Sequence, residues 1–205
     1  MTVLAVDTSS RRRGLCVLAG DDGTLLDQRA LTGRHLDREL PPALSALLRD
    51  DLGAVACVLG PGSYTGLRVG IAAALGLAHA RDLPLHGIGA LEVVALAAPG
   101  SAAEVEAVAD AGRGALHVGR YRREGDAVHC IAEPRRVDGA AWSPAPGATA
   151  VSLDGVDGAV DAAGRAAQAL ALAAAASLQR PPLPRAGLAP IYLHGDGSAP
   201  GQPRV

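Results

Sequence analysis

Residues 55–80 read VACVLGPGSYTGLRVGIAAALGLAHA. The first five form a continuous apolar run, which is typical of a strand buried on both faces. A glycine-rich turn covers residues 60–66, and apolar side chains then recur at helical spacing at Leu67, Ile71, Leu75 and Ala78. A further apolar run at 84–88 follows. This strand–turn–helix–strand order predicts an α/β protein.

Two short apolar runs precede this unit, at residues 3–6 and 15–18, and a third strand is predicted at 25–31 after the turn signal at 21–23. Their connections are short, so they are predicted to be antiparallel neighbours. Helical spacing follows over 36–48, with Pro41 and Pro42 early enough for a first turn, or marking a kink or a late start. Three meandering strands followed by α-β-α-β, with a short helix at 90–97, is the order of a ribonuclease-H-like lobe, as in actin-like ATPases.

The second half also begins with several predicted strands, and it resembles a reduced copy of the first half. Strands are predicted at 105–109, 116–121, 128–132 and 151–153, a loop at 142–149, and a helix at 159–178. A small-residue, turn-rich stretch at 97–103 marks a lobe boundary. We therefore expect an actin-like ATPase (ribonuclease-H-like) fold with two lobes, the second reduced: residues 1–97, residues 104–194, and a flexible Gly/Pro/Ser-rich tail at 195–205.

Charge and composition exclude some functions. Nineteen basic residues against 21 acidic ones give a net charge of −2, which argues against a strongly basic nucleic-acid binder. Aromatic residues make up 2% of the chain, too few for the stacking platforms that bind single-stranded RNA. No two of the six histidines have the helical spacing of a metal site, so no metal is expected.

The cysteines and the N-terminus indicate the compartment. Cys16, Cys57 and Cys130 each lie in an apolar run, without C-x-x-C spacing, and are expected as buried, reduced thiols. The first six residues lack the basic and long apolar regions of a signal peptide, and the Ala-rich stretch 159–178 is too polar to span a bilayer. A cytoplasmic protein without membrane contact is expected.

The glycine-rich turn has two interpretations. Amides at a helix N-terminus bind anions, yet Leu67 stands where a P-loop needs lysine, and Thr65 where G-x-G-x-x-G needs glycine. Alternatively, the glycines allow close packing, and Ser63 or Thr65 caps the helix. The residues of this signature turn are Gly60, Pro61, Gly62, Ser63, Thr65, Gly66 and Arg68.

Two acidic turns resemble the phosphate loops of actin-like ATPases. The first strand ends in Asp7, Thr8 and Ser9, the candidate nucleotide or anion residues, and Asp110-Ala111-Gly112 occupies the corresponding place in the second half. The alternative for the Asp7 turn is a structural one, in which these polar side chains only cap the hairpin between the first two strands. Arg11–Arg13 follow in the hairpin, either touching phosphate or exposed to solvent.

Residues 4–9, LAVDTS, and 60–70, GPGSYTGLRVG, resemble the TsaB (YeaZ) family. The match continues to about residue 95. Residues 110–117 resemble an eroded form of a family motif, with Ala115 and His117 in place of glutamate and tyrosine, and residues 190–193 resemble a C-terminal Pro-x-Tyr-Leu with His194 where arginine is usual.

The resemblance implies an actin-like paralogue of TsaD, the transferase that adds threonylcarbamoyl to the adenosine next to the anticodon of tRNA. It implies a non-catalytic subunit that binds a TsaD-like transferase, is joined by a TsaE-like ATPase, and reaches tRNA indirectly. No cofactor of its own is expected, and any ATP or ADP is expected at the complex interface. The alternative is an actin-like nucleotide hydrolase or kinase that uses Asp7 and Asp110.

The helices at 36–48 and 67–80 carry more apolar residues than one core-facing stripe needs, and small residues allow another helix to approach closely. The resemblance implies that these two helices form the surface that binds the TsaD-like partner. Without a partner, the same surface is expected to pair two copies of the chain. The alternative is that the second lobe of the chain covers them. The predicted docking residues are Leu36, Leu40, Leu44, Leu48, Ala73, Gly76 and Leu77.

Overall fold

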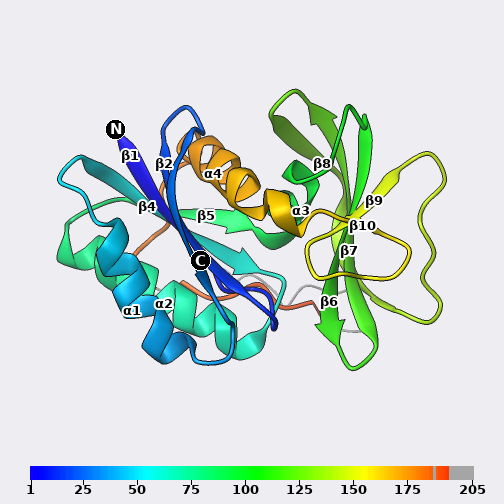
Figure 1. The fold of residues 1–205 in the computed structure, drawn as a ribbon, viewed down its shortest axis with the longest axis horizontal. Coiled ribbons are helices and arrows are strands. Elements are labelled where there is room, and N and C mark those ends of the chain that lie inside the picture. The colour runs from blue at the N-terminus through cyan, green and yellow to red at the C-terminus, as the bar shows by residue number, and fades with distance from the viewer. Residues whose placement is uncertain (187, 194–205) are drawn as a thin grey trace.

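The computed structural model describes residues 1–186 and 188–193, and it contains two five-stranded sheets side by side (Figure 1). The first sheet has the order β3-β2-β1-β4-β5. Strands β1, β2 and β3 form an antiparallel meander, and β4 and β5 continue parallel to β1. The strand bounds are β1 (Thr2–Asp7), β2 (Gly14–Gly20), β3 (Leu25–Leu31), β4 (Leu52–Gly60) and β5 (Leu85–Gly89).

Helices cover both faces of this sheet. Helices α1 (Leu36–Leu47) and α2 (Tyr64–Ala80) lie on one face, at the lower left of Figure 1, and α4 (Ala166–Ser177) lies on the other. Alternate residues of β1 face opposite layers, so Leu4 and Val6 pack with α1 while Val3 and Ala5 belong to the other core. Both faces of β1 are therefore buried, which explains its unbroken apolar sequence.

The second sheet has the order β10-β9-β6-β7-β8. Strand β7 pairs antiparallel with both β6 and β8, and the short helix α3 (Ala90–Leu96) contacts β6, β7 and β8 from the side of the first lobe. One core cluster contains residues of both sheets, so the two lobes pack directly on each other. The bounds are β6 (Glu104–Gly112), β7 (Ala115–Glu124), β8 (Ala127–Asp138), β9 (Thr149–Ser152) and β10 (Val160–Asp161).

The last helix differs from the sequence expectation in length and place. Val160 belongs to strand β10 and pairs with Val151 of β9. Oδ1 of Asp161 accepts a 3.0 Å hydrogen bond from the amide of Ala163. The α-helix therefore begins at Ala166 rather than near residue 159. The expected second lobe, 104–194, included this helix. Helix α4 instead packs against β1, β2 and β5, because the apolar face of the first sheet opposite α1 needs a cover.

The chain after α4 also returns to the first lobe. The amide of Leu183 donates to the carbonyl of Leu85 in β5, and the amide of Ile191 donates to the carbonyl of Leu59 in β4, both at 2.7 Å. The strand-rich second lobe is thus an insertion between α3 and α4. The expected tail, 195–205, and His194 lie outside the described residues.

One expectation for the cysteines is wrong. Cys16 and Cys57 are buried in β2 and β4, but Cys130 is exposed, since β8 is an edge strand. Burial raises the pKa of both inner thiols to about 12, with the charge of Asp7 adding to the effect at Cys16. In the described ranges, no helix is both long enough and apolar enough to cross a membrane.

Candidate functional site

The carboxylate of Asp7 is held by its own turn. Asp7 is 3% exposed at the end of β1, and its Oδ1 accepts hydrogen bonds from the amide of Ser9 at 2.9 Å and the hydroxyl of Ser9 at 2.6 Å. Its Oδ2 lies 3.7 Å from Nη1 of Arg13. The charge that would attract Mg²⁺ in a nucleotide site is therefore offset by an arginine of the same hairpin.

Asp154 joins this hairpin to the second lobe. Its Oδ1 accepts a 2.8 Å hydrogen bond from the hydroxyl of Ser10, and its Oδ2 accepts a 3.2 Å bond from the amide of Asp110. Nε of Arg13 lies 3.9 Å from Oδ1, and Nη1 of Arg12 donates to the backbone carbonyl of Asp154 at 3.1 Å. We call Ser10, Arg13, Asp110 and Asp154 the lobe clamp.

Sequence reasoning missed Asp154. It directly follows the predicted strand at 151–153 and precedes Gly155, and an acidic residue at the end of a strand was the available signal. The arginines also make contacts that neither sequence interpretation anticipated. Arg12 and Arg13 are not simply exposed to solvent, since they bind backbone oxygen atoms of the second lobe, and phosphate contact by this turn stays a prediction.

The lobe clamp leaves almost no space between the two acidic turns. The structure brings Asp7 and Asp110 to the same cleft, as the actin-like order predicts, together with Asp154. The cavity there measures about 10 Å³, room for about one water molecule at most. In this arrangement a nucleotide does not fit between Asp7 and Asp110.

The signature turn packs against the Asp7 turn. Thr8 Oγ1 donates a 2.7 Å hydrogen bond to the carbonyl of Gly66, and the amide of Ser63 donates to the carbonyl of Ser9 at 2.7 Å. A Cβ added at Gly66 would lie 2.1 Å from the carbonyl oxygen of Thr8, and one at Gly70 would lie 2.1 Å from Thr8 Oγ1. These contacts support the packing interpretation.

The amides at the start of α2 are also used within the chain. Ser63 is the N-cap, and its hydroxyl accepts from the amide of Gly66 at 3.3 Å. Thr65 and Arg68 are exposed, and the Arg68 guanidinium lies 3.9 Å from the ring centroid of Tyr64, which in turn stacks on Tyr192 at 5.2 Å. The signature turn thus forms the packed N-terminus of α2, and Tyr64 and Arg68 are exposed beside it.

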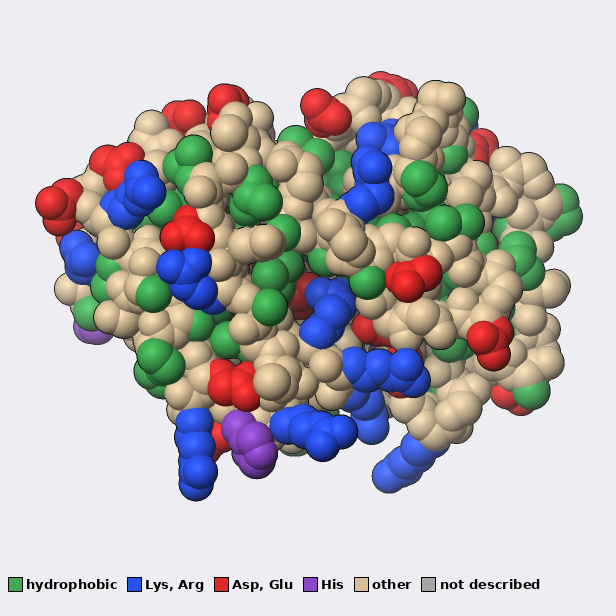
Figure 2. Space-filling view, in the orientation of Figure 1, with side chains coloured by type: hydrophobic (Ala, Val, Ile, Leu, Met, Phe, Trp, Pro, Cys, Tyr) green, Lys and Arg blue, Asp and Glu red, His purple; other side chains and the backbone are tan. Residues whose placement is uncertain are grey.

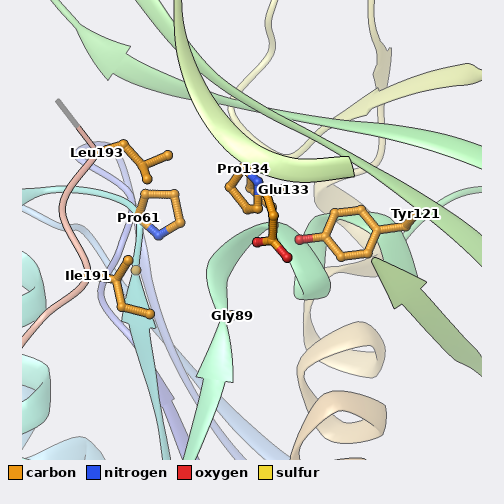
Figure 3. Close-up of a pocket in the computed structure, with 9 residues that line it drawn as sticks. Pro61, Gly89, Tyr121, Glu133, Pro134, Ile191 and Leu193 are labelled. Carbon is orange, nitrogen blue, oxygen red and sulfur yellow. The ribbon is translucent and has the colours of Figure 1, made fainter. Parts of the chain in front are cut away.

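A larger cavity of about 370 Å³ opens at the carboxyl ends of β4 and β5 (Figure 3). The Tyr121 hydroxyl points toward the Glu133 carboxylate on one side, and burial raises the pKa of Tyr121, so that the hydroxyl remains protonated. Sequence reasoning missed this cavity because its walls come from both lobes and the C-terminal segment. The lining residues are Gly60, Pro61, Gly89, Leu91, Tyr121, Glu133, Pro134, Ile191 and Leu193.

The predicted docking residues divide between the core and the surface. Leu36, Leu40 and Leu44 lie on the inner face of α1 and are buried against the sheet, where the apolar side chains of Leu4, Val6 and Cys16 need a cover. These three leucines are therefore not exposed for a partner. Leu48, Ala73 and Leu77 are partly buried, and Gly76 is exposed.

Within residues 1–186 and 188–193, no three His, Cys, Asp or Glu side chains are grouped so that they could hold a metal ion. That the chain binds no metal stays a prediction.

Comparisons with known proteins agree on one family. The family model described as "TsaD: tRNA N6-adenosine threonylcarbamoyltransferase" matches residues 30–181. The tRNA threonylcarbamoyladenosine biosynthesis protein TsaB of Bacillus subtilis is 31% identical over 148 residues, 69% of this chain and 64% of that protein. TsaB of Escherichia coli is 34% identical over 136 residues, 62% of this chain and 58% of its own length.

The chain thus spans less than two thirds of these curated relatives. The solved structure of YeaZ from Pseudomonas aeruginosa superposes with a TM-score of 0.75 at 24% identity, covering 94% of this chain and 99% of that chain. It supports the two-lobed fold. With the Asp7 turn and the signature turn packed together as described, the chain belongs to the TsaB (YeaZ) family, within the family that the TsaD model describes.

Proposed function

We propose that this chain is a non-catalytic, cytoplasmic subunit of the machinery that forms threonylcarbamoyladenosine in tRNA, and that it acts by binding a TsaD-like transferase. The relatives named TsaB support the pathway. The observation that carries the non-catalytic role is the filled cleft, where Arg13 and Asp154 take the space and the charge that a nucleotide would need beside Asp7.

The docking surface is the outer seam between α1 and α2, which we define as Leu48, Val69, Ala73, Gly76 and Leu77. The first three and the last of these residues are partly buried and pack against the apolar cluster between α1 and the first sheet. A Cβ added at Gly76 would meet no atom within 4 Å. A seam of small and half-buried apolar residues allows a helix of the partner to approach closely. A TsaE-like ATPase joins this pair, any ATP or ADP is held at the complex interface, and tRNA is reached through the complex.

The test is co-purification of the chain with the TsaD-like protein of its host. Ala73→Glu and Gly76→Glu are expected to abolish the association while the chain stays folded. Ala127→Glu, at an exposed position of β8 in the other lobe, is the matched control and keeps it. Sedimentation of each variant alone tests whether the same seam pairs two copies. Unchanged partner binding by both seam variants would place the interface elsewhere.

A nucleotide hydrolase or kinase is the second candidate, since Asp7 and Asp110 line one cleft, but it requires the lobe clamp to open. The proposal expects no ATP hydrolysis by the purified chain. Saturable hydrolysis that disappears in Asp7→Ala would favour the enzyme instead.

A further inference from the structure

His117 is a buried polar residue without a visible partner. It lies in β7, is 6% exposed, and its Nδ1 makes no hydrogen bond among the described residues. Buried polar atoms are nearly always hydrogen-bonded, so an unpaired imidazole nitrogen calls for a ligand or another explanation.

The sheet register places a cation beside it. Ala109 of β6 and Arg136 of β8 lie directly opposite His117 on its two neighbouring strands. Directly opposite residues share one face of a sheet, and Ala109 lines the cleft between the lobes. The side chains of His117 and Arg136 therefore lie on the face that is turned toward the first lobe.

Arg11 approaches the end of β6, next to the β6–β7 turn, from the first lobe. A Cβ added at Gly112, at the end of β6, would lie 2.6 Å from Cζ of Arg11, so the guanidinium rests on the backbone of that glycine. Electrostatics agree with this placement. Burial first, and then the charges of Arg136 and Arg11, lower the pKa of His117 to about 4, against the opposing effect of Asp110.

Arg11 and Arg136 differ from Arg12 and Arg13 in their hydrogen bonds and ion pairs. Arg12 and Arg13 are bound to Asp154, Asp7 and backbone carbonyls. Over residues 1–186 and 188–193, by contrast, neither Arg11 nor Arg136 has a side-chain hydrogen bond or an ion pair. Oδ1 of the nearby Asp110 already accepts the amide of Gly112 at 2.7 Å. Arginine side chains gather along the lower edge of the face shown in Figure 2, on the side where β6 ends in Figure 1.

We propose that Arg11, His117 and Arg136 form a binding site for a phosphate group at the edge of the lobe interface. Two guanidinium groups supply planar, charge-assisted donors, and a neutral imidazole supplies one further N–H donor. The site lies beside the lobe clamp and shares no residue with it. The phosphate belongs either to the backbone of an RNA, a source that rests on the proposed function, or to a free phosphate compound.

The test uses the full chain with ¹⁵N-labelled histidine and inorganic phosphate as the probe, against chloride at equal ionic strength. The His117 signals are expected to shift saturably, and bound phosphate is expected to raise the pKa of His117. Arg11→Gln and Arg136→Gln should each weaken binding about tenfold or more, the cost of one lost hydrogen bond to a charged group. Unchanged melting temperatures confirm that both variants are folded.

Arg135→Gln is the matched control, because it removes the same charge one residue away on the opposite face of β8, across from Val118. It should bind phosphate as before. A His117 signal that does not respond to phosphate, or an equal loss in Arg135→Gln, overturns the proposal.

A second arm separates the two sources of phosphate. A labelled anticodon stem-loop RNA is titrated at several salt concentrations, with inorganic phosphate as competitor. If the RNA uses the site, phosphate competes, and Arg11→Gln and Arg136→Gln each reduce the salt slope by roughly 0.7 to 0.9. If phosphate binds and the RNA does not compete, the site serves a free phosphate compound. Because no partner protein is present, failure of the TsaD interaction leaves this result unaffected.

Discussion

The hydroxyl of Ser10 donates a 2.8 Å hydrogen bond to Oδ1 of Asp154, across 144 positions of sequence and across the interface between the lobes. The same carboxylate accepts the amide of Asp110 and lies near Arg13. One side chain of the second lobe therefore satisfies donors from both acidic turns, and it holds closed the cleft that an actin-like nucleotide enzyme would keep open.

Asp154→Ala should destabilise the chain by about 2–4 kcal/mol, because it leaves the Ser10 hydroxyl and the Asp110 amide, both partly buried, without their acceptor and removes one of the two carboxylates beside Arg13. Urea unfolding measures the change. Asp157→Ala, at an exposed position of the following loop, should alter the free energy of unfolding by less than about 0.5 kcal/mol. Equal stabilities of the two variants would show that the lobe clamp contributes little.

Two glycines of α2 should respond to alanine in opposite directions. At Gly70 the new methyl group would meet Thr8 Oγ1 and disturb its bond to Gly66, so Gly70→Ala should cost about 1–3 kcal/mol. At Gly76 there is open space, and Gly76→Ala should stabilise the helix by about 0.5–1 kcal/mol. Thermal unfolding of both variants tests the pair, and a loss of stability at Gly76 would contradict the account.

The cysteines should differ in reactivity. Cys130 is exposed and should react with a thiol reagent such as Ellman's reagent in the native chain, whereas Cys16 and Cys57 should react only after unfolding. Their burial and their pKa values of about 12 keep both inner thiols protonated. Cys130→Ser should abolish the native reaction, and any remaining rapid labelling would mean that the core opens readily.

Acid should destabilise the chain through His117. Its pKa is about 6.5 when unfolded and about 4 in the fold, so the unfolded state binds more protons between these values. The contribution of His117 to stability is therefore fully present above pH 6.5 and is lost as the pH is lowered toward 4, by about 3 kcal/mol in total. His117→Gln should flatten this part of the pH profile of unfolding. An unchanged profile would show that His117 titrates normally in the folded chain.

Local patterns in the sequence were sufficient for most elements. The turn signal at 21–23 preceded a predicted strand at 25–31, which β3 has as its bounds, and the helical spacing after Gly66 predicted α2. Residues 4–9 and 60–70 were sufficient to indicate the family, because each is a short motif that can be read without knowing that the two segments contact each other. In each case the signal lies within a few turns of chain.

Tertiary structure alone decided which element covers each apolar face. The sequence predicted helices at the positions of α1 and α4. It did not show that the leucines of α1 are buried against β1 and β2, nor that α4 packs on the first sheet. The same holds for the exposure of Cys130 on an edge strand and for the bond between Ser10 and Asp154. The sequence by itself determined the elements, their order and the family, because these depend on neighbours in the chain. The filled cleft and the remaining surface depend on contacts between residues distant in the sequence, up to 144 positions apart for Ser10 and Asp154, which no local pattern records.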